Sequence, residues 1–425
     1  MILTIERIVY PGERLAHWEG RTVFTDEGLP GETVEALLVR KGKDRLVART
    51  VRVVAPSPRR IAPRCDHFRS CGSYQCLPYP DQVELKSGQL REMLGTIAGA
   101  PADGVAFVPS AESWNYRNRV RFRVVWTGPR ASLAYREPES ETEFVPAGGC
   151  HLVTAPVNAL LEACRGIIEK EKLHGIREVE ARISRATGEM LLSLHRSGPA
   201  RPGEIDPFLT GLRPAFDLAG ILSVTKAARG PRATTEWGRG FIEERAGDRT
   251  FRIGAASFFQ VNGAMLGPVI EELRGFAGRA RQGRMADIYC GLGTFGIALS
   301  DLFREGAGVE SDPANIEFLE ANTALNGIRS FRIYEGRSEE WTDLLLEKGV
   351  DMAVVDPPRK GLDPGVVRSL LGRPPASLAY LSCHPATLVR DLRALAQAFR
   401  IVSVRGYDFF PQTPHIEALA LLVRK

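Results

Sequence analysis

The sequence predicts a C-terminal α/β unit with a largely parallel sheet, preceded by a mixed α/β unit and a small N-terminal β-barrel. From about residue 254 onward, strand-like and helix-like stretches alternate. Residues 1–57 hold short apolar runs separated by glycine-containing turns. At 425 residues the chain is too long for one hydrophobic core. We therefore expect three domains, at residues 1–57, 58–253 and 254–425.

The composition is that of an ordinary globular protein, with 44% apolar and 25% charged residues. The 56 Lys and Arg residues against 51 Asp and Glu give a net charge of +5, which permits a nucleic-acid partner without demanding one. We see no signal segment and no apolar run of about 18 residues, so we expect no membrane association. Seven cysteines, an odd number, favour reduced thiols in the cytoplasm.

The predicted barrel rests on short β segments within residues 3–9, 20–24, 32–39 and 45–54. Several Lys and Arg residues lie on and between the last two segments. They form either a solvated face or a nucleic-acid-binding face, since a barrel with a basic face is a usual nucleic-acid module. Both interpretations stay open at this stage. The proline-dense stretch 56–63 predicts a linker.

Three cysteines, Cys65, Cys71 and Cys76, lie within twelve positions, and Cys150 follows downstream. Closely spaced cysteines in a cytosolic chain most often bind metal, and four thiolates would complete either a zinc site or an iron–sulfur cluster. The neighbouring histidines at 67 and 151 keep zinc open. The alternative is a chance grouping of free thiols.

One strand of the mixed unit, within residues 116–125, carries arginine at every second position. Alternation places Arg117, Arg119, Arg121 and Arg123 on one face of a sheet, where like charges repel. An RNA backbone would relieve that repulsion. The alternative is a solvated edge whose arginines find scattered carboxylates.

A nucleotide-cofactor fingerprint opens the C-terminal unit. The predicted strand 285–289 leads into Gly291-Leu-Gly293-Thr-Phe-Gly296, and Glu310 ends the next strand 19 residues after Gly291. Glycines let the backbone approach a ligand, and a carboxylate at this position binds ribose hydroxyls, as in Rossmann-like folds. The spacing does not distinguish NAD from S-adenosylmethionine, and a plain glycine turn is the alternative.

Three later strand ends carry candidate catalytic groups. Asp356 begins the rigid loop Asp-Pro-Pro-Arg-Lys-Gly361, and Cys383 lies between a strand and the helix that Pro385 opens. A helix N-terminus favours the thiolate form of Cys383, although a buried structural thiol is the alternative. Glu417 enters the apolar strand 418–423, where burial should raise its pKa toward that of a neutral-pH base; a rim glutamate is the alternative.

Together these residues resemble the RNA uracil-C5 methyltransferase family over nearly the whole chain. The matching motifs are Gly28-Leu-Pro-Gly-Glu32, the cysteines, Tyr116-Arg-Asn, Ser257-Phe-Phe-Gln-Val-Asn262, Asp287-Ile-Tyr-Cys-Gly, Asp356-Pro-Pro-Arg-Lys-Gly, Ser382-Cys-His-Pro-Ala-Thr and Asp408-Phe-Phe-Pro-Gln-Thr-Pro-His-Ile-Glu417. The last three, in this order, are specific to the family. The resemblance implies a class I methyltransferase domain, an N-terminal TRAM barrel, S-adenosylmethionine and a [4Fe–4S] cluster.

The resemblance also implies a role for each site residue. Cys383 adds to uracil C6, and Glu417 removes the C5 proton after methyl transfer. The residues around cofactor and base are Gln260, Tyr289, Gly291, Gly293, Glu310 and Asp356. Phe258 or Phe259 either stacks on a base or belongs to the core. The expected substrate is a uridine in structured rRNA or tRNA, methylated by a monomer. An RNA-binding protein with a relic catalytic domain and a methyltransferase for small pyrimidines are the alternatives.

The chain departs from the family at the cysteines. The family has Cys-Gly-Gly-Cys followed by Gln-His, whereas this chain has Cys71-Gly-Ser-Tyr-Gln-Cys76. Either Cys76 has taken over the third ligand position or the cluster has lost a ligand. We favour the first, with Cys65, Cys71, Cys76 and Cys150 as cluster ligands and the two histidines as spectators.

Overall fold

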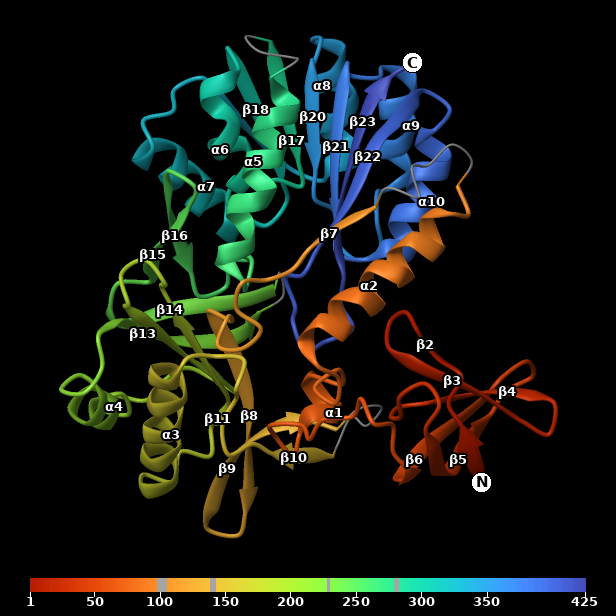
Figure 1. The fold of residues 1–425 in the computed structure, drawn as a ribbon. Helices are drawn as coiled ribbons and strands as arrows, with labels where there is room; N and C mark the ends of the chain where they lie inside the picture. Colours follow the sequence, from red (N-terminus) through yellow and green to blue (C-terminus); the bar gives the residue numbers. More distant parts are fainter. Residues whose placement is uncertain (98–104, 138–142, 228–229, 279–282) are drawn as a thin grey trace.

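The computed structural model describes residues 1–97, 105–137, 143–227, 230–278 and 283–425. Its strands form three large sheets and one separate hairpin. The N-terminal sheet lies beside the central unit, and the C-terminal unit stacks above both (Figure 1). No helix among the described residues is long and apolar enough to cross a membrane.

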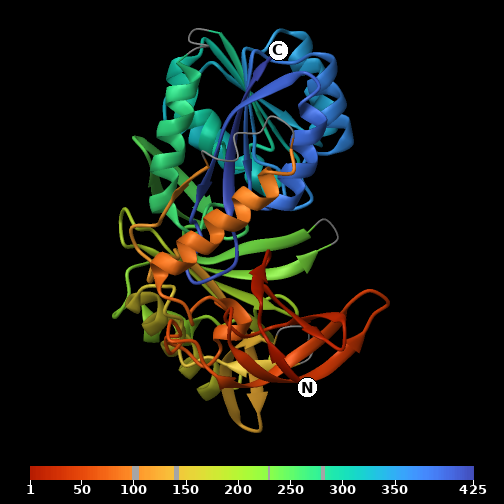
Figure 2. The same cartoon turned by 45° about the vertical axis from the view of Figure 1, so that its right-hand side comes forward.

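The N-terminal barrel is a six-stranded sheet in the order β1-β5-β6-β4-β3-β2. Its small core contains Leu3, Ala16, Val23 and Val34, which alternate with exposed residues along short strands as the sequence predicts. The turn between β2 and β3 points toward the C-terminal unit in both views (Figures 1 and 2). The strands are β1 (Ile2–Thr4), β2 (Arg7–Val9), β3 (Glu13–Trp18), β4 (Arg21–Thr25), β5 (Thr33–Lys41) and β6 (Leu46–Ala55).

The central unit is a seven-stranded sheet in the order β10-β9-β8-β11-β12-β13-β14, with two helices. The short helix α1 (Phe68–Cys71) precedes this sheet in the chain and contains part of the cysteine motif. The remaining elements are β8 (Arg119–Thr127), β9 (Arg130–Arg136), β10 (Phe144–Pro146), α3 (Ala155–Lys170), β11 (Ile176–Ile183), β12 (Met190–Arg196), α4 (Asp206–Leu212), β13 (Leu218–Ala227) and β14 (Gly230–Gly238). The hairpin of β15 (Phe241–Ala246) and β16 (Arg249–Gly254) leads to the C-terminal unit.

The C-terminal unit has an eight-stranded sheet in the order β19-β18-β17-β20-β21-β23-β22-β7. Strands β17 to β21 are parallel, and β23 runs antiparallel to both of its neighbours. Chain order reverses between β17 and β20, which is where open α/β sheets bind ligands. The strands are β17 (Arg284–Ile288), β18 (Glu305–Glu310), β19 (Phe331–Glu335), β20 (Met352–Val355), β21 (Ser377–Ser382), β22 (Phe399–Tyr407) and β23 (Glu417–Arg424).

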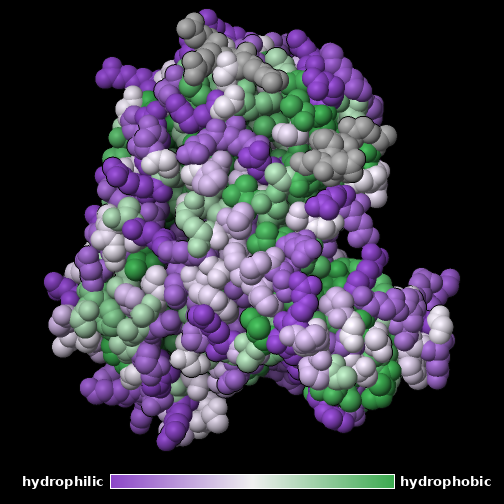
Figure 3. Space-filling view, viewed as in Figure 1, coloured by the Kyte–Doolittle hydropathy of each residue, from purple (hydrophilic) through white to green (hydrophobic). Residues whose placement is uncertain are grey.

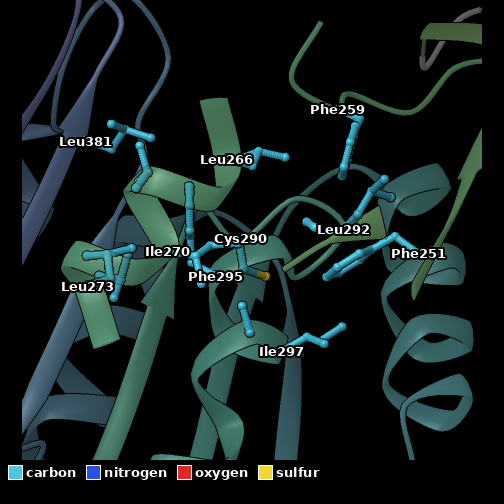
Figure 4. Close-up of a cluster of buried hydrophobic side chains, with 14 of the residues drawn as sticks. Phe251, Phe259, Leu266, Ile270, Leu273, Cys290, Leu292, Phe295, Ile297 and Leu381 are labelled. Atoms are coloured by element: carbon cyan, nitrogen blue, oxygen red, sulfur yellow. The ribbon is translucent and has the colours of Figure 1, made fainter. Parts of the chain in front are cut away.

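Helices cover both faces of this sheet (Figures 1 and 2). On one face Leu266, Ile270 and Leu273 of α5 pack beside Phe295 and Ile297 of α6 (Figure 4). A second apolar cluster, containing Leu370, Leu388 and Leu392, fills the other face. The helices are α5 (Leu266–Ala277), α6 (Thr294–Leu299), α7 (Pro313–Leu325), α8 (Ser338–Glu347), α9 (Pro364–Gly372) and α10 (Pro385–Leu395), with short 3₁₀ turns at Gly263–Met265 and Ser300–Leu302.

A segment assigned by sequence to the middle domain packs on the C-terminal unit instead. Helix α2 (Tyr79–Leu94) contacts α10, and its Leu90 and Leu94 belong to the second apolar cluster. Strand β7 (Ala106–Val108) pairs with β22 as the edge of the C-terminal sheet. Leu90 and Leu94 lie on one face of the helix. Burial of this apolar face against α10 stabilises the placement of α2 on the C-terminal unit, although α2 is closer in sequence to the central unit.

The exposed side chains are mixed in character. In the space-filling view hydrophilic residues cover most of the visible face, with smaller apolar areas between them (Figure 3). Exposed apolar side chains in the barrel include Leu37 and Val39 of β5 and Val51 of β6.

Candidate active site and cysteine motif

The glycine-rich loop lies between β17 and α6, at the point where strand order reverses. Gly291 and Gly293 have φ values of 56° and 82°, which glycine adopts at little cost. A Cβ at Gly293 would come within 2.4 Å of the Leu319 side chain, so this glycine allows the loop to pack on α7. A Cβ at Gly291 would meet nothing within 4 Å. The space beside Gly291 is therefore open for a ligand.

Carboxylates hold the glycine-rich loop in place. Glu310, at the end of β18, accepts hydrogen bonds from the Gly291 amide at 2.9 Å and from the amides of Ser311 and Asp312. Asp287 accepts one from the Gly296 amide at 2.7 Å, while its other oxygen has no partner among the described residues. Burial raises the pKa of Asp287 to about 7. The loop is thus preorganised to cradle a nucleotide-like cofactor beside Glu310.

Cys383 lies between β21 and α10, as the sequence predicts. Its side chain is partly exposed, and His384 caps the helix by accepting from the Thr387 amide. The expectation that the helix N-terminus favours the thiolate is not met, since the pKa of Cys383 is raised to about 12. Burial is the main cause, and Glu417 and Asp356 add to it. This environment therefore favours the thiol form of Cys383.

Glu417 is the first residue of β23 and is only 2% exposed, so the alternative of a rim glutamate does not hold. Its Oε2 has no hydrogen-bond partner among the described residues. Burial, with Asp356 nearby, raises the pKa of Glu417 well above its usual value, whereas Arg359 lowers it. Burial also raises the pKa of Asp356 to about 7. Asp356 and Arg359 are thus close enough to Cys383 and Glu417 to influence the pKa values of both groups.

A buried polar network fixes the loop of residues 408–416 that leads to Glu417. Lys86 of α2 donates to Asp408 Oδ1 at 2.7 Å and to the Phe410 carbonyl at 2.9 Å, and both charged side chains are fully buried. Gln82, one turn earlier on α2, exchanges hydrogen bonds with Gln412 at 2.8 and 2.9 Å. Sequence analysis missed this network, because α2 and the loop are more than 300 residues apart.

The N-terminal barrel reaches this site through Tyr10, which sequence analysis also missed. The Tyr10 ring lies edge-on to His384, with 5.4 Å between ring centroids, and it packs against the second apolar cluster. Arg14 holds the turn by donating to the carbonyls of Gly12, Gly28 and Ser73. A Cβ at Gly12 would come within 2.8 Å of Pro414. The turn therefore packs closely on the 408–416 loop.

Gln260 and Tyr289 are the remaining residues that the sequence predicts around the cofactor and the base. Gln260 is buried after β16, and its carbonyl accepts from the Asn118 side chain at 3.0 Å. The Tyr289 hydroxyl accepts from the Asp363 amide at 3.2 Å, so this ring points toward the start of α9. Of the two phenylalanines, Phe259 belongs to the core (Figure 4), whereas Phe258 is 59% exposed. Phe258 is the one available to a base.

The arginines of β8 are paired within the protein, contrary to our preferred expectation. Arg119 binds Glu180 at 2.8 Å, and Arg123 binds Glu178 at 3.0 Å. Arg121 lies 3.5 Å from Glu178 and 3.7 Å from Glu180. These carboxylates face the arginines from β11, the antiparallel neighbour of β8. For these three arginines the carboxylate alternative is correct, because Glu178 and Glu180 relieve the repulsion. Strand β8 is an interior strand and not a solvated edge. The fourth arginine, Arg117, lies before β8, and its Nε has no partner among the described residues.

Only two of the four predicted cysteine ligands lie in one compact group of potential metal donors among the described residues. Potential donor atoms of Cys65, His67 and Cys71 all lie within 4.8 Å of one another. Cys150 lies near this group, since its thiol contributes to the raised pKa of Cys71. Cys76 is not a member: it packs with Ile8, Leu29, Tyr74 and Leu77. The four cysteines that the resemblance implies as cluster ligands therefore do not lie together. The chain after Cys71 directs Cys76 away from the other cysteines, into the apolar contact with the N-terminal barrel.

The known proteins that this chain resembles are RNA methyltransferases. A family model described as tRNA (Uracil-5-)-methyltransferase matches residues 221–425. An uncharacterized RNA methyltransferase of Gloeobacter violaceus is 34% identical over 96% of this chain and 92% of its own length. The chain belongs to the RNA uracil-C5 methyltransferase family. Another family relative, from Thermosynechococcus vestitus, is 30% identical over 99% of this chain and 97% of its own length.

A solved structure of the family agrees with the fold. The Pyrococcus abyssi tRNA (uracil-54, C5)-methyltransferase in complex with S-adenosyl-L-homocysteine has a TM-score of 0.79 and 25% identity to this chain. The match covers 99% of this chain and 100% of the other. The C-terminal sheet is thus that of a class I S-adenosylmethionine-dependent methyltransferase, and the chain is a methyltransferase.

Proposed function

We propose that this protein transfers a methyl group from S-adenosylmethionine to C5 of a uridine in structured RNA, with Cys383 as nucleophile and Glu417 as base. The observation that carries the proposal is the proximity of the partly exposed Cys383 thiol and the buried Glu417 carboxylate, at the sheet edge where the open glycine-rich loop lies. One oxygen of Glu417 has no partner among the described residues. Gln260, Tyr289, Gly291, Gly293, Glu310 and Asp356 are the proposed residues around cofactor and base.

Uracil C5 is a poor nucleophile, so the reaction needs covalent activation. Cys383 loses its thiol proton to solvent, a step that the positive charge of Arg359 favours, and its Sγ then forms a bond to C6, which makes C5 an enolate carbon. S-adenosylmethionine supplies the methyl group as an electrophile. Glu417 then takes the proton from C5, the pyrimidine double bond re-forms, and the C6–S bond breaks to release Cys383. The raised pKa of Glu417 suits it to hold that proton near neutral pH.

Arg359 provides the positive charge for this sequence of steps. It is exposed in the Asp356-Pro-Pro loop and lowers the pKa of both Cys383 and Glu417. It therefore opposes the effect of burial and of Asp356 on the thiol. An RNA chain that covers the loop would exclude water and strengthen this attraction.

RNA rather than a free pyrimidine is the proposed acceptor. The N-terminal barrel, which we propose to be a TRAM domain, has no part in pyrimidine chemistry as such, yet it touches the site through Tyr10. Exposed Phe258 offers a ring on which an unstacked base can rest. Both tRNA and rRNA remain candidate substrates; the Pyrococcus relative acts on tRNA. We further propose a monomer that works in the cytoplasm.

The [4Fe–4S] cluster that the family resemblance implies is not part of this proposal. The structure groups two cysteines with a histidine, places Cys150 nearby and leaves Cys76 outside, so four thiolates do not converge. None of the catalytic steps above depends on a metal centre.

The function is tested by incubating the purified protein with methyl-labelled S-adenosylmethionine and unmodified tRNA or rRNA, followed by nucleoside analysis. We expect label in 5-methyluridine, none with Cys383→Ala, and far less with free uridine. Label in 5-methylcytidine, or equal transfer to free nucleoside and RNA, would contradict the assignment of the reaction or of its substrate.

A further inference from the structure

The donor group around α1 has the dimensions of a site for one metal ion. Cys65, His67 and Cys71 each offer a donor atom within 4.8 Å of the other two. Two sulfur ligands of a tetrahedral zinc ion lie about 3.8 Å apart, because Zn–S is about 2.3 Å. Donor atoms within 4.8 Å of one another would have to move closer by about 1 Å at most to bind one ion. In an iron–sulfur cubane each thiolate binds a different iron atom and the ligands are spread around the cluster. A compact donor group therefore favours a mononuclear ion.

His67 has the features of a ligand rather than a spectator. Its side chain is buried, with 4% of the residue exposed, and its Nε2 has no hydrogen-bond partner among the described residues. The ring stacks on Tyr135 at a centroid separation of 4.9 Å, which fixes its orientation. A buried imidazole nitrogen without a partner costs free energy unless a proton donor or metal ion satisfies it.

Cys150 can supply the fourth donor. It is 2% exposed. Tyr135, which stacks on His67, donates its hydroxyl to Cys150 Sγ at 3.4 Å. The Asn158 side chain holds the Cys150 backbone with hydrogen bonds of 2.8 and 3.0 Å. Cys150 thus lies on the same side of the donor group as Tyr135, on a fixed backbone.

Cys76 cannot join this set without leaving its own environment. It is 2% exposed among apolar residues, beside Arg60 of the linker. Tyr74, three positions after Cys71, is fully buried and also belongs to that apolar contact. The segment after Cys71 therefore packs against the N-terminal barrel.

We propose that Cys65, His67, Cys71 and Cys150 bind one tetrahedral divalent ion, and that the ion is zinc. Three sulfur donors and one imidazole are a usual closed, structural zinc set. The ion would fasten α1 and its preceding loop to the segment that carries Cys150, next to the central sheet. It has no role in the methyl-transfer steps, so this proposal stands or falls independently of them.

Metal analysis tests the proposal on protein purified both with and without air. We expect one zinc per chain, no acid-labile sulfide and no brown colour in either preparation. Three or more irons with sulfide in the anaerobic protein would overturn it, as would metal-free protein with a Cys65–Cys71 disulfide.

Substitutions identify the ligands. Cys76→Ser should keep a full equivalent of zinc, whereas His67→Ala should lose at least tenfold in zinc affinity. Because His67→Ala could also disturb folding, His67→Cys is a second test. This variant should retain the metal. The visible spectrum of its cobalt-substituted form should differ from that of the wild type, because sulfur replaces nitrogen as a ligand. Loss of metal from Cys76→Ser, or an unchanged cobalt spectrum in His67→Cys, would contradict the assigned ligands.

Discussion

At the scale of single residues, Cys383 lies in an environment that opposes its ionisation. Burial and two carboxylates raise the pKa of its thiol to about 12, and Arg359 works against them. A nucleophile held as a thiol reacts little with solvent oxidants or electrophiles until substrate arrives. The arrangement protects the cysteine at the expense of reactivity at neutral pH, and it makes Arg359 important for catalysis.

Arg359→Gln should therefore change the pH dependence of the reaction. Removal of the cation raises the pKa of Cys383 further, so the rising limb of kcat/KM against pH should move to higher pH. Activity at pH 7 should fall about tenfold for every pH unit by which that limb moves, and it should partly recover in alkaline buffer. The neighbouring, equally exposed Lys360→Gln is the control. An unchanged profile would show that Arg359 does not act on the thiol.

Asp356→Asn should stabilise the folded protein at alkaline pH. Burial raises the pKa of Asp356 from 3.8 to about 7, so the wild-type protein loses stability as pH rises from about 4 through about 7. The loss is at most about 4 kcal/mol, since a pKa difference of one between the folded and unfolded states is worth about 1.4 kcal/mol. The variant should therefore melt higher than wild type at pH 8, with a smaller difference at pH 5. Exposed Asp44→Asn is the control; an equal gain at both pH values would contradict the cause.

At the scale of elements, α2 supports the active site from outside the sheet. Its buried Lys86 is the partner of Asp408, at the start of the loop that ends in Glu417. Lys86→Met would leave a buried carboxylate unpaired, which typically costs about 3–5 kcal/mol. We expect a comparable loss in unfolding free energy, together with a lower kcat. Exposed Lys170→Met should change neither quantity.

A double-mutant cycle separates this pairing from general damage to the helix. Combining Lys86→Met with Asp408→Asn removes both charges, so the double variant should be more stable than the sum of the two single effects predicts. Additive effects on urea unfolding would mean that the two side chains are not coupled.

At the scale of the whole molecule, the N-terminal barrel contacts the proposed active site, in addition to its proposed role in RNA binding. Tyr10 touches His384, so Tyr10→Ala should lower kcat by roughly tenfold while changing RNA affinity by less than about threefold. Tyr10→Phe keeps the ring and should retain most of the activity. Leu37→Ala, at an exposed site elsewhere in the barrel, is the control. Equal effects of Tyr10→Ala and Leu37→Ala on kcat would contradict a role for this contact.

How far the sequence predicts the molecule depends on whether a feature is local. The glycine-rich loop, the place of Cys383 after a strand and the entry of Glu417 into an apolar strand are encoded within short segments, so pattern and resemblance locate them. The Lys86–Asp408 pair and the Tyr10–His384 contact join segments more than 300 residues apart. The arginines of β8 were misinterpreted because nothing in their own strand shows that Glu178 and Glu180 lie opposite.

The central claim is that Cys383 forms a covalent bond to the target uracil, and RNA containing 5-fluorouridine tests it most directly. Fluorine at C5 cannot be removed as a proton, so the adduct should persist after methyl transfer. With S-adenosylmethionine present, we expect a protein–RNA band that survives denaturing electrophoresis, with the cross-linked peptide containing Cys383. Cys383→Ala should give no such band, whereas Cys164→Ala, a buried cysteine of the central unit, should still give the band. A stable band with Cys383→Ala, or a cross-link at another residue, would contradict the mechanism.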